Sequence, residues 1–169
     1  ALRLLDMIID KSVAGLINLD LVEKQTVRAA GCFPQNYNDH GIHFFYGIPK
    51  DGQSLEDVEK LLIAQIERVK KGEFEDWVIP AVITDFKKQE KENRENNAKR
   101  VELMRDTFLS FVDWETTNRE IEELEKLTKE DIVRVANSYF GENYVVGFRI
   151  DAQHKLPSIE KPEIDPLQI

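Results

Sequence analysis

The chain has 169 residues and a net charge of −9, with 41% hydrophobic and 33% charged residues, which is typical of one globular domain with its own core. The acidic balance excludes a protein whose main task is to bind a phosphate backbone, because such surfaces need clustered Lys and Arg. No apolar run is long enough to cross a membrane, and a single cysteine excludes an internal disulfide.

The first third of the chain predicts a helix followed by two strands. Residues 2–9 are apolar on nearly all helical faces, so we expect that helix to lie between other elements. Residues 25–32 and 41–48 have strand-like alternation, and residues 33–39 between them have the composition of a turn. Because no crossover helix fits between these strands, we expect them to pair antiparallel.

A well-marked helix follows the second strand. Ser54 with Asp57 three residues on is typical of an N-cap, and Gly72 is typical of the residue that ends a helix. Apolar residues at helical spacing, Ile66 among them, predict one buried stripe on this helix. Pro80 then fits the next helix only in its first turn, where its missing N–H costs nothing.

Helix is also expected over residues 81–140, which contain no Gly or Pro, with reversals at residues 113–117 and 127–128. Within this span, residues 87–100 form the most charged stretch of the chain. The stretch predicts a solvated helix face. The alternative is a surface that faces another domain or a polar substrate channel.

A capped helix followed by a strand is predicted near the end. Thr128 and Asp131 have the spacing of a capping box, and Gly141 is expected to end the helix in the left-handed conformation. Residues 143–151 are rich in β-branched and aromatic side chains and predict a strand.

This order of elements predicts the α+β class, with a small antiparallel sheet packed against several helices. We place the α+β domain at residues 1–152. Residues 153–169 contain three prolines between single charges and are interpreted as an extended linker.

Candidate ligands and catalytic groups are few. His40 and His43 stand three apart around a turn and strand start, where they point to opposite faces and cannot easily hold one ion. His154 falls in the expected linker, and Cys32 is interpreted as a small buried side chain. We therefore expect no metal site, no cofactor site and no catalytic residue in this chain.

Two further groups of residues have structural explanations. Four glutamates flank apolar residues on one expected helix, so most of them face solvent, and no base or nucleophile accompanies them. Four aromatic residues have the spacing of core aromatics. The glutamates are Glu120, Glu122, Glu123 and Glu125, and the aromatics are Trp77, Phe108, Phe111 and Trp114.

A family resemblance rests on the order and spacing of five segments. Residues 4–34 give a helix, a loop and a strand; residues 41–74 give a strand and a helix that ends in Lys-Gly-Glu-Phe; residues 76–111 give a long helix. Residues 127–150 give the closing helix and strand, and residues 161–166 a connector. Together they resemble the pitrilysin, insulinase and mitochondrial-processing-peptidase family of zinc peptidases, the inverzincins.

The resemblance implies a non-catalytic repeat. Each half of such a protein contains two similar α+β repeats, and the H-x-x-E-H zinc helix lies in the first repeat of the first half. This sequence has no H-x-x-E-H, so the zinc ligands and the glutamate base have no matching positions here. We therefore expect the second repeat of the first half of a large bacterial member, begun after its first strands, with zinc only in the parent protein.

The resemblance also implies partners and a location. The repeat would form part of the peptide-enclosing chamber and support the catalytic repeat; the alternative is a scaffold module of a subunit that lost its metal site. Its partners would be the other repeats and the parent's peptide substrate, in the bacterial periplasm or cell envelope. Without the strands before Ala1, we expect a homodimer formed through the first helix or an open sheet edge.

Overall fold

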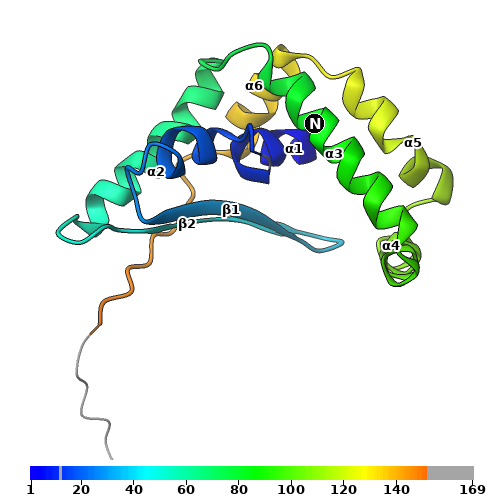
Figure 1. Cartoon of the computed structure of the whole chain (residues 1–169), viewed down its shortest axis with the longest axis horizontal. Coiled ribbons are helices and arrows are strands. Elements are labelled where there is room, and N and C mark those ends of the chain that lie inside the picture. The colour runs from blue at the N-terminus through cyan, green and yellow to red at the C-terminus, as the bar shows by residue number, and fades with distance from the viewer. Residues whose placement is uncertain (12, 152–169) are drawn as a thin grey trace, which may run out of the picture.

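The computed structural model describes residues 1–11 and 13–151 and has an α+β architecture. A two-stranded antiparallel sheet, β1 (Ala29–Asn36) and β2 (Gly41–Ile48), carries helices on one face (Figure 1). The α+β class with a small antiparallel sheet is thereby confirmed. No helix in the described part is long and apolar enough to cross a membrane. The expected linker at residues 153–169, with His154, lies outside the described residues.

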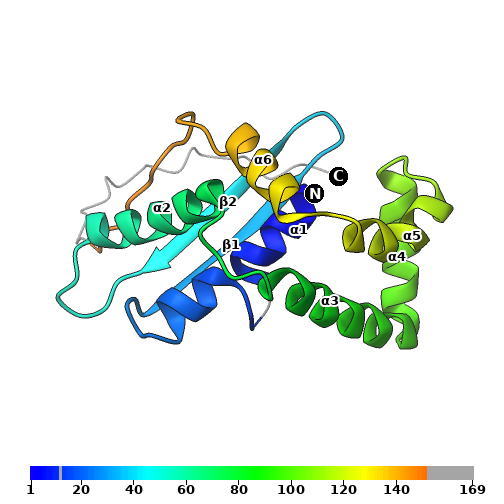
Figure 2. The ribbon, with the colours of Figure 1, turned by 90° about the horizontal axis from the view of Figure 1, so that it is seen from above.

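The chain begins with a short, deeply buried helix. α1 (Leu2–Asp6) passes directly into the π-helical turn η1 (Met7–Lys11), and a second such turn, η2 (Asn18–Val22), precedes the sheet. Figure 2 shows α1 crossing above the strands and beside α6 (Lys129–Tyr139). The apolar side chains of α1 and η1 are 0% exposed at Leu4, Leu5, Ile8 and Ile9. The helix therefore lies between other elements, as the sequence predicts.

The first strand is displaced from its expected position. It begins at Ala29, because the chain turns just before it, with Gln25 at a left-handed φ of 51°. It then continues through Pro34, which pairs opposite His43, to Asn36. Proline is tolerated there because β1 pairs on one side only within the described residues and can leave one ladder position without an N–H.

The strand predicted at residues 143–151 is absent. The segment has no regular structure, and its apolar side chains are exposed, Val145 to 97% and Ile150 to 73%. β-branched and aromatic residues favour a strand only where a neighbour supplies hydrogen bonds and packing. Neither strand of the described sheet pairs with this segment, so the prediction from composition was wrong.

Local capping signals set the bounds of α2 (Leu55–Lys71) as predicted. The Ser54 hydroxyl accepts a hydrogen bond of 3.1 Å from the Asp57 backbone N–H, and Gly72 takes the left-handed conformation, with φ 71°. Ile66 is half-buried, whereas four other residues form the buried stripe of α2. These are Val58, Leu62, Gln65 and Val69.

Three helices follow α2 before α6 begins. They are α3 (Val78–Glu95), α4 (Asn97–Leu109) and α5 (Trp114–Glu125). Both predicted reversals are present, and Pro80 lies in the first turn of α3. A further break at Asn96 was not predicted; its side chain accepts hydrogen bonds from the Ala98 and Lys99 backbone N–H groups and so begins a new helix.

The two ends of α6 differ in how well the sequence predicted them. Thr128 and Asp131 form the expected capping box. At the other end Phe140 is the capping residue, with φ −97°, and Gly141 does not take the left-handed conformation. The role predicted for Gly141 was therefore wrong.

The four aromatic residues expected in the core are exposed. Figure 2 shows α4 and α5 lying away from the sheet, and α4 has no buried residue. Aromatic spacing on a helix places side chains in a core only where another element covers that face, and no element of the described residues buries these four side chains. The exposed fractions are 52% for Trp77, 77% for Phe108, 86% for Phe111 and 44% for Trp114.

Candidate metal centre

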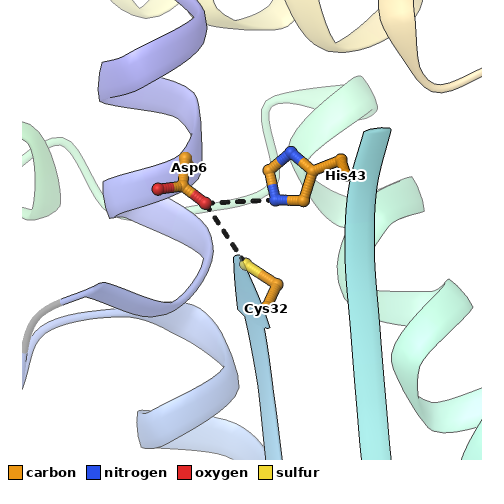
Figure 3. A group of neighbouring side chains, drawn as sticks. All are labelled: Asp6, Cys32 and His43. Carbon is orange, nitrogen blue, oxygen red and sulfur yellow. Dashed lines mark hydrogen bonds and ion pairs between the residues drawn. The ribbon is translucent and has the colours of Figure 1, made fainter. Parts of the chain in front are cut away.

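Three side chains that can ligate a metal meet between α1 and the sheet: Asp6 from α1, Cys32 from β1 and His43 from β2 (Figure 3). In the sheet register, Cys32 pairs with Phe45 and Pro34 pairs with His43. Residues two apart on a strand share a face, so Cys32 and His43 are diagonal neighbours on one face. That face is the one covered by α1, which brings Asp6 over both of them.

One oxygen of Asp6 is common to both contacts. Asp6 Oδ1 lies 3.1 Å from His43 Nε2 and 3.7 Å from Cys32 Sγ, and all three donor atoms lie within 4.8 Å of one another. Asp6 is 1% exposed, Cys32 5%, and the His43 side chain 13%. The cluster is thus nearly removed from water.

The second oxygen of Asp6 faces a cation. Lys11 Nζ lies 2.8 Å from Asp6 Oδ2. The two residues are five apart, the spacing that a π-helical turn such as η1 aligns on one side. Burial by itself raises the pKa of Asp6, but His43 and Lys11 together outweigh it and hold that pKa below its ordinary value. Asp6 is therefore ionised at neutral pH.

A second carboxylate, that of Asp10, binds the backbone at Cys32. Asp10 Oδ2 accepts a hydrogen bond of 2.6 Å from the Cys32 backbone N–H. Burial raises the pKa of Asp10 above its ordinary value. The hydrogen bond from the Cys32 N–H partly lowers this pKa, and the nearby negative charge of Asp6 raises it further. Gly31 makes the approach possible, because a Cβ there would lie 2.7 Å from Asp10 Oδ2.

Cys32 has no features of a nucleophile. Burial raises the pKa of its thiol strongly, and the charges of Asp6 and Asp10 raise it further. A nucleophilic cysteine needs the opposite surroundings, with a cation or a helix N-terminus that stabilises the thiolate. The surroundings of Cys32 therefore favour the protonated thiol over the thiolate.

The imidazole of His43 is fixed by two aromatic rings. It stacks on Phe45 with ring centroids 4.9 Å apart and meets Phe140 edge-on at 5.4 Å. Although Nε2 is close to Asp6, its N–H is not directed well enough to form a hydrogen bond with any protein group in the described residues. The ring is thus held in place while its inward nitrogen lacks a well-directed partner.

The residues singled out from the sequence are only partly brought together. His40 lies in the β1–β2 turn and is exposed, whereas His43 points toward α1. Asp6 is not among the residues predicted from the sequence, although a single acid in the largely apolar segment LRLLDMII is a signal of a buried polar contact. The distances from Cys32 to Asp6 and to His43 depend on the strand register and on how α1 packs on the sheet. Local sequence patterns do not predict either of these.

The charged surface and the four glutamates lie outside this cluster. Residues 87–100 are exposed apart from Glu90, whose carboxylate lies 3.5 Å from Arg94 Nε. Glu125 pairs with Lys87 and Glu120 with Arg3, while Glu122 and Glu123 are exposed. Lys88, Gln89 and Glu92 of the charged stretch line, together with Asp10 and Lys11, a depression beside the cluster.

Comparison with known proteins gives likeness in fold alone. No family model matches the sequence, and no curated protein matches it. A protease from Helicobacter pylori superposes with a TM-score of 0.73 at 22% identity, over 82% of this chain and 34% of that one. A conserved protein from Enterococcus faecalis V583 superposes with a TM-score of 0.65 at 18% identity, over 80% of this chain and 32% of that one. The chain thus spans about a third of the length of each.

Proposed function

We propose that this chain is a non-catalytic domain of a zinc metallopeptidase, in which it forms part of the peptide-enclosing chamber and supports the catalytic repeat. The observation that carries this proposal is the likeness in fold to about a third of a protease from Helicobacter pylori. The lack of H-x-x-E-H in the sequence supports a role beside the catalytic repeat.

The residues present do not fit the zinc site of such peptidases. That site needs two histidines one turn apart on a helix, with a glutamate as base. The chain has three histidines, and none lies on a described helix: His40 is in a turn, His43 is on β2, and His154 is outside the described residues. The zinc-activated water of the parent is therefore assigned to residues outside this chain.

The open face of the sheet has the chemistry of a peptide-binding wall. Phe33 and Phe44 stack there at 5.2 Å, and both are exposed, as are the outward side chains of β2 at Ile42 and Tyr46. Each strand also has one edge without a partner in the described residues. An extended peptide can add to such an edge through backbone hydrogen bonds, with alternate side chains against the aromatic face.

A complementation assay tests this proposal. The chain alone, with added zinc, is expected to leave a quenched fluorescent peptide library uncleaved. Addition of a polypeptide that contains H-x-x-E-H and is encoded in the same reading frame should produce cleavage of the library. The matched control carries Gln in place of the glutamate of that motif and should remain inactive. Chelator-sensitive cleavage by the chain alone would contradict the proposal.

An interaction scaffold is the second candidate, favoured by the apolar surface at the α4–α5 turn. Phe108 and Phe111 are among the most exposed aromatic side chains of the described structure, and apolar surfaces of this kind mark protein contacts. The reading frame before Ala1 separates the two functions. An intact H-x-x-E-H there favours the peptidase, and its loss favours the scaffold.

A further inference from the structure

We propose that Asp6, Cys32 and His43 bind one divalent cation of the zinc type, a site that goes beyond the peptidase role proposed above. The three residues supply a carboxylate oxygen, a thiolate sulfur and an imidazole nitrogen, the three donor types that zinc takes from proteins. They come from three different elements, so one cation there ties α1 to both strands of the sheet (Figure 3).

Two of the three donor separations are close to those around a tetrahedral ion, and all three donor atoms lie within 4.8 Å of one another. Zinc–sulfur bonds of about 2.3 Å and zinc–nitrogen or zinc–oxygen bonds of about 2.0–2.1 Å imply donor separations of about 3.3–3.6 Å at tetrahedral angles. The observed separations from Asp6 Oδ1 are 3.1 Å to His43 Nε2 and 3.7 Å to Cys32 Sγ. Only small side-chain shifts are needed to close a coordination sphere around a cation among these atoms.

Two buried polar atoms of the cluster have an ion-pair contact, with Lys11 at Asp6 Oδ2 and with Asp6 Oδ1 at His43 Nε2, but no well-directed hydrogen bond with a protein group in the described residues. Asp6, at 1% exposed, is also cut off from bulk water. Buried groups left in this state are costly in a folded protein. A cation between Asp6 and His43 gives the nitrogen a ligand bond and neutralises the carboxylate.

The surroundings orient the donors for one cation. Lys11 approaches Asp6 Oδ2, which leaves Oδ1, the oxygen shared by the other two donors, free to ligate. Asp10 fixes the backbone at Cys32 through its 2.6 Å hydrogen bond. Such supporting contacts hold metal ligands in position in known sites. Three protein donors leave the fourth tetrahedral position for a water molecule.

The donor set selects the class of cation. Thiolate sulfur favours zinc, cobalt and similar ions, while magnesium and calcium take oxygen donors. On binding, the Cys32 S–H bond breaks, the proton passes to solvent, and the thiolate sulfur bonds to the cation. The charges of Asp6 and the thiolate then balance the two positive charges of the ion.

Solvent reaches the edge of the cluster. A depression of about 540 Å³ lies between η1, β1 and α3, and its lining includes Asp10, Lys11 and Ala30. The Lys11 side chain is 47% exposed although the Asp6 carboxylate that it contacts is buried. Lys11 thus connects the lining of this depression to the buried carboxylate of Asp6.

Titration of the full metal-free chain with Co²⁺ tests the site. Tetrahedral coordination by a thiolate is expected to give strong visible bands and a near-ultraviolet thiolate-to-cobalt band that saturates at one ion per chain. Cys32 is the only cysteine in the sequence, so the thiolate band identifies the ligand without a variant. Zn²⁺ should displace the cobalt and abolish both sets of bands. A weak octahedral spectrum without the thiolate band would overturn the proposal.

Two histidine variants provide a matched comparison. His43→Gln is expected to weaken Zn²⁺ binding about 100-fold or more, because even loss of an outer supporting contact typically costs about 10–100-fold. His40→Gln, in the exposed turn three residues away, should bind as the wild type does. Equal affinities for both variants, each with a native circular dichroism spectrum, would refute the site. If His43→Gln does not fold, the thiolate-to-cobalt band of the wild type and its loss on addition of Zn²⁺ decide the question.

Discussion

Asp10 and Cys32 join the first helical segment to the sheet: Asp10 Oδ2 accepts a hydrogen bond of 2.6 Å from the Cys32 backbone N–H, 22 residues further along the chain. In the described residues, no other side chain of η1 accepts a hydrogen bond from β1. Loss of the carboxylate leaves a poorly solvated backbone donor, which costs about 1–3 kcal/mol. Asp10→Ala should therefore lower the free energy of unfolding by about 1–3 kcal/mol in chemical denaturation.

The control for Asp10→Ala is Asp39→Ala. Asp39 lies in the exposed β1–β2 turn, and its loss should change the free energy of unfolding by less than about 0.5 kcal/mol. Equal losses for both variants would mean that the hydrogen bond to Cys32 contributes nothing.

Gly31 provides a second test of the same contact. A Cβ at this position would lie 2.7 Å from Asp10 Oδ2 and 2.7 Å from Tyr46 Oη. Gly31→Ala must displace one of these side chains, and overpacking of this kind costs about 1–3 kcal/mol. Gly147→Ala, where a Cβ meets nothing within 4 Å, is the control and should be nearly neutral in thermal unfolding. A Gly31→Ala variant as stable as the wild type would contradict the close contact between Gly31 and the Asp10 carboxylate.

Local signals predicted this fold better than nonlocal ones. Ser54, Gly72 and the Thr128–Asp131 pair set helix ends through bonds within a few residues, and the structure contains them. The break at Asn96 was missed, although an Asn before a helical run is itself a capping signal. Because the region lacks Gly and Pro, its composition favours one uninterrupted helix.

The candidate metal centre was not predictable from spacing along the chain. Asp6, Cys32 and His43 are separated by 26 and 11 residues, and they meet because strand register and helix docking bring them together. The predicted strand at residues 143–151 failed for a related reason, because a strand needs a partner that composition does not specify. Both features depend on contacts between distant segments.

Two isoleucines test where the core ends. Ile132 on α6 is 0% exposed and Ile150 is 73% exposed. Ile132→Ala should destabilise the chain by about 2–5 kcal/mol, because it leaves a cavity in the core. The same substitution at Ile150 should cost under about 0.5 kcal/mol. A large loss at Ile150 would show that residues 143–151 pack as the strand that the sequence predicted.

Stability in acid should depend on Asp20. Burial by itself raises the pKa of Asp20, but Lys24 and Arg68 outweigh it and lower that pKa below its ordinary value. The ionised carboxylate therefore stabilises the fold. Its contribution is complete above the unfolded-state pKa of about 3.9 and is lost as the pH falls through the lower folded-state pKa.

Denaturation of the wild type and Asp20→Asn from about pH 7 to about pH 2 measures this contribution. The variant should be less stable at neutral pH, and the difference should shrink toward zero in acid. Asp51→Asn, in the exposed turn before α2, should follow the wild type throughout. A difference between wild type and Asp20→Asn that stays constant with pH would indicate lost packing instead of lost charge.

Self-association should proceed through the sheet and not through the first helix. α1 was one of two expected contact surfaces, but Leu4, Leu5, Ile8 and Ile9 are 0% exposed and unavailable. β2 remains: it pairs with β1 alone in the described residues, and it contains no Pro, Lys or Glu to block its free edge.

We therefore predict a two-fold dimer in which β2 edges pair. Sedimentation equilibrium over a range of concentrations should show a monomer–dimer equilibrium for the wild type. Ile42→Lys, at a β2 side chain that is 52% exposed, should shift this equilibrium toward monomer, because a lysine on an edge opposes strand pairing. Val101→Lys, at a 66% exposed position on α4, should leave it unchanged. If only Val101→Lys dissociates the dimer, the α4 surface is the contact, and a monomer at all concentrations would refute the prediction.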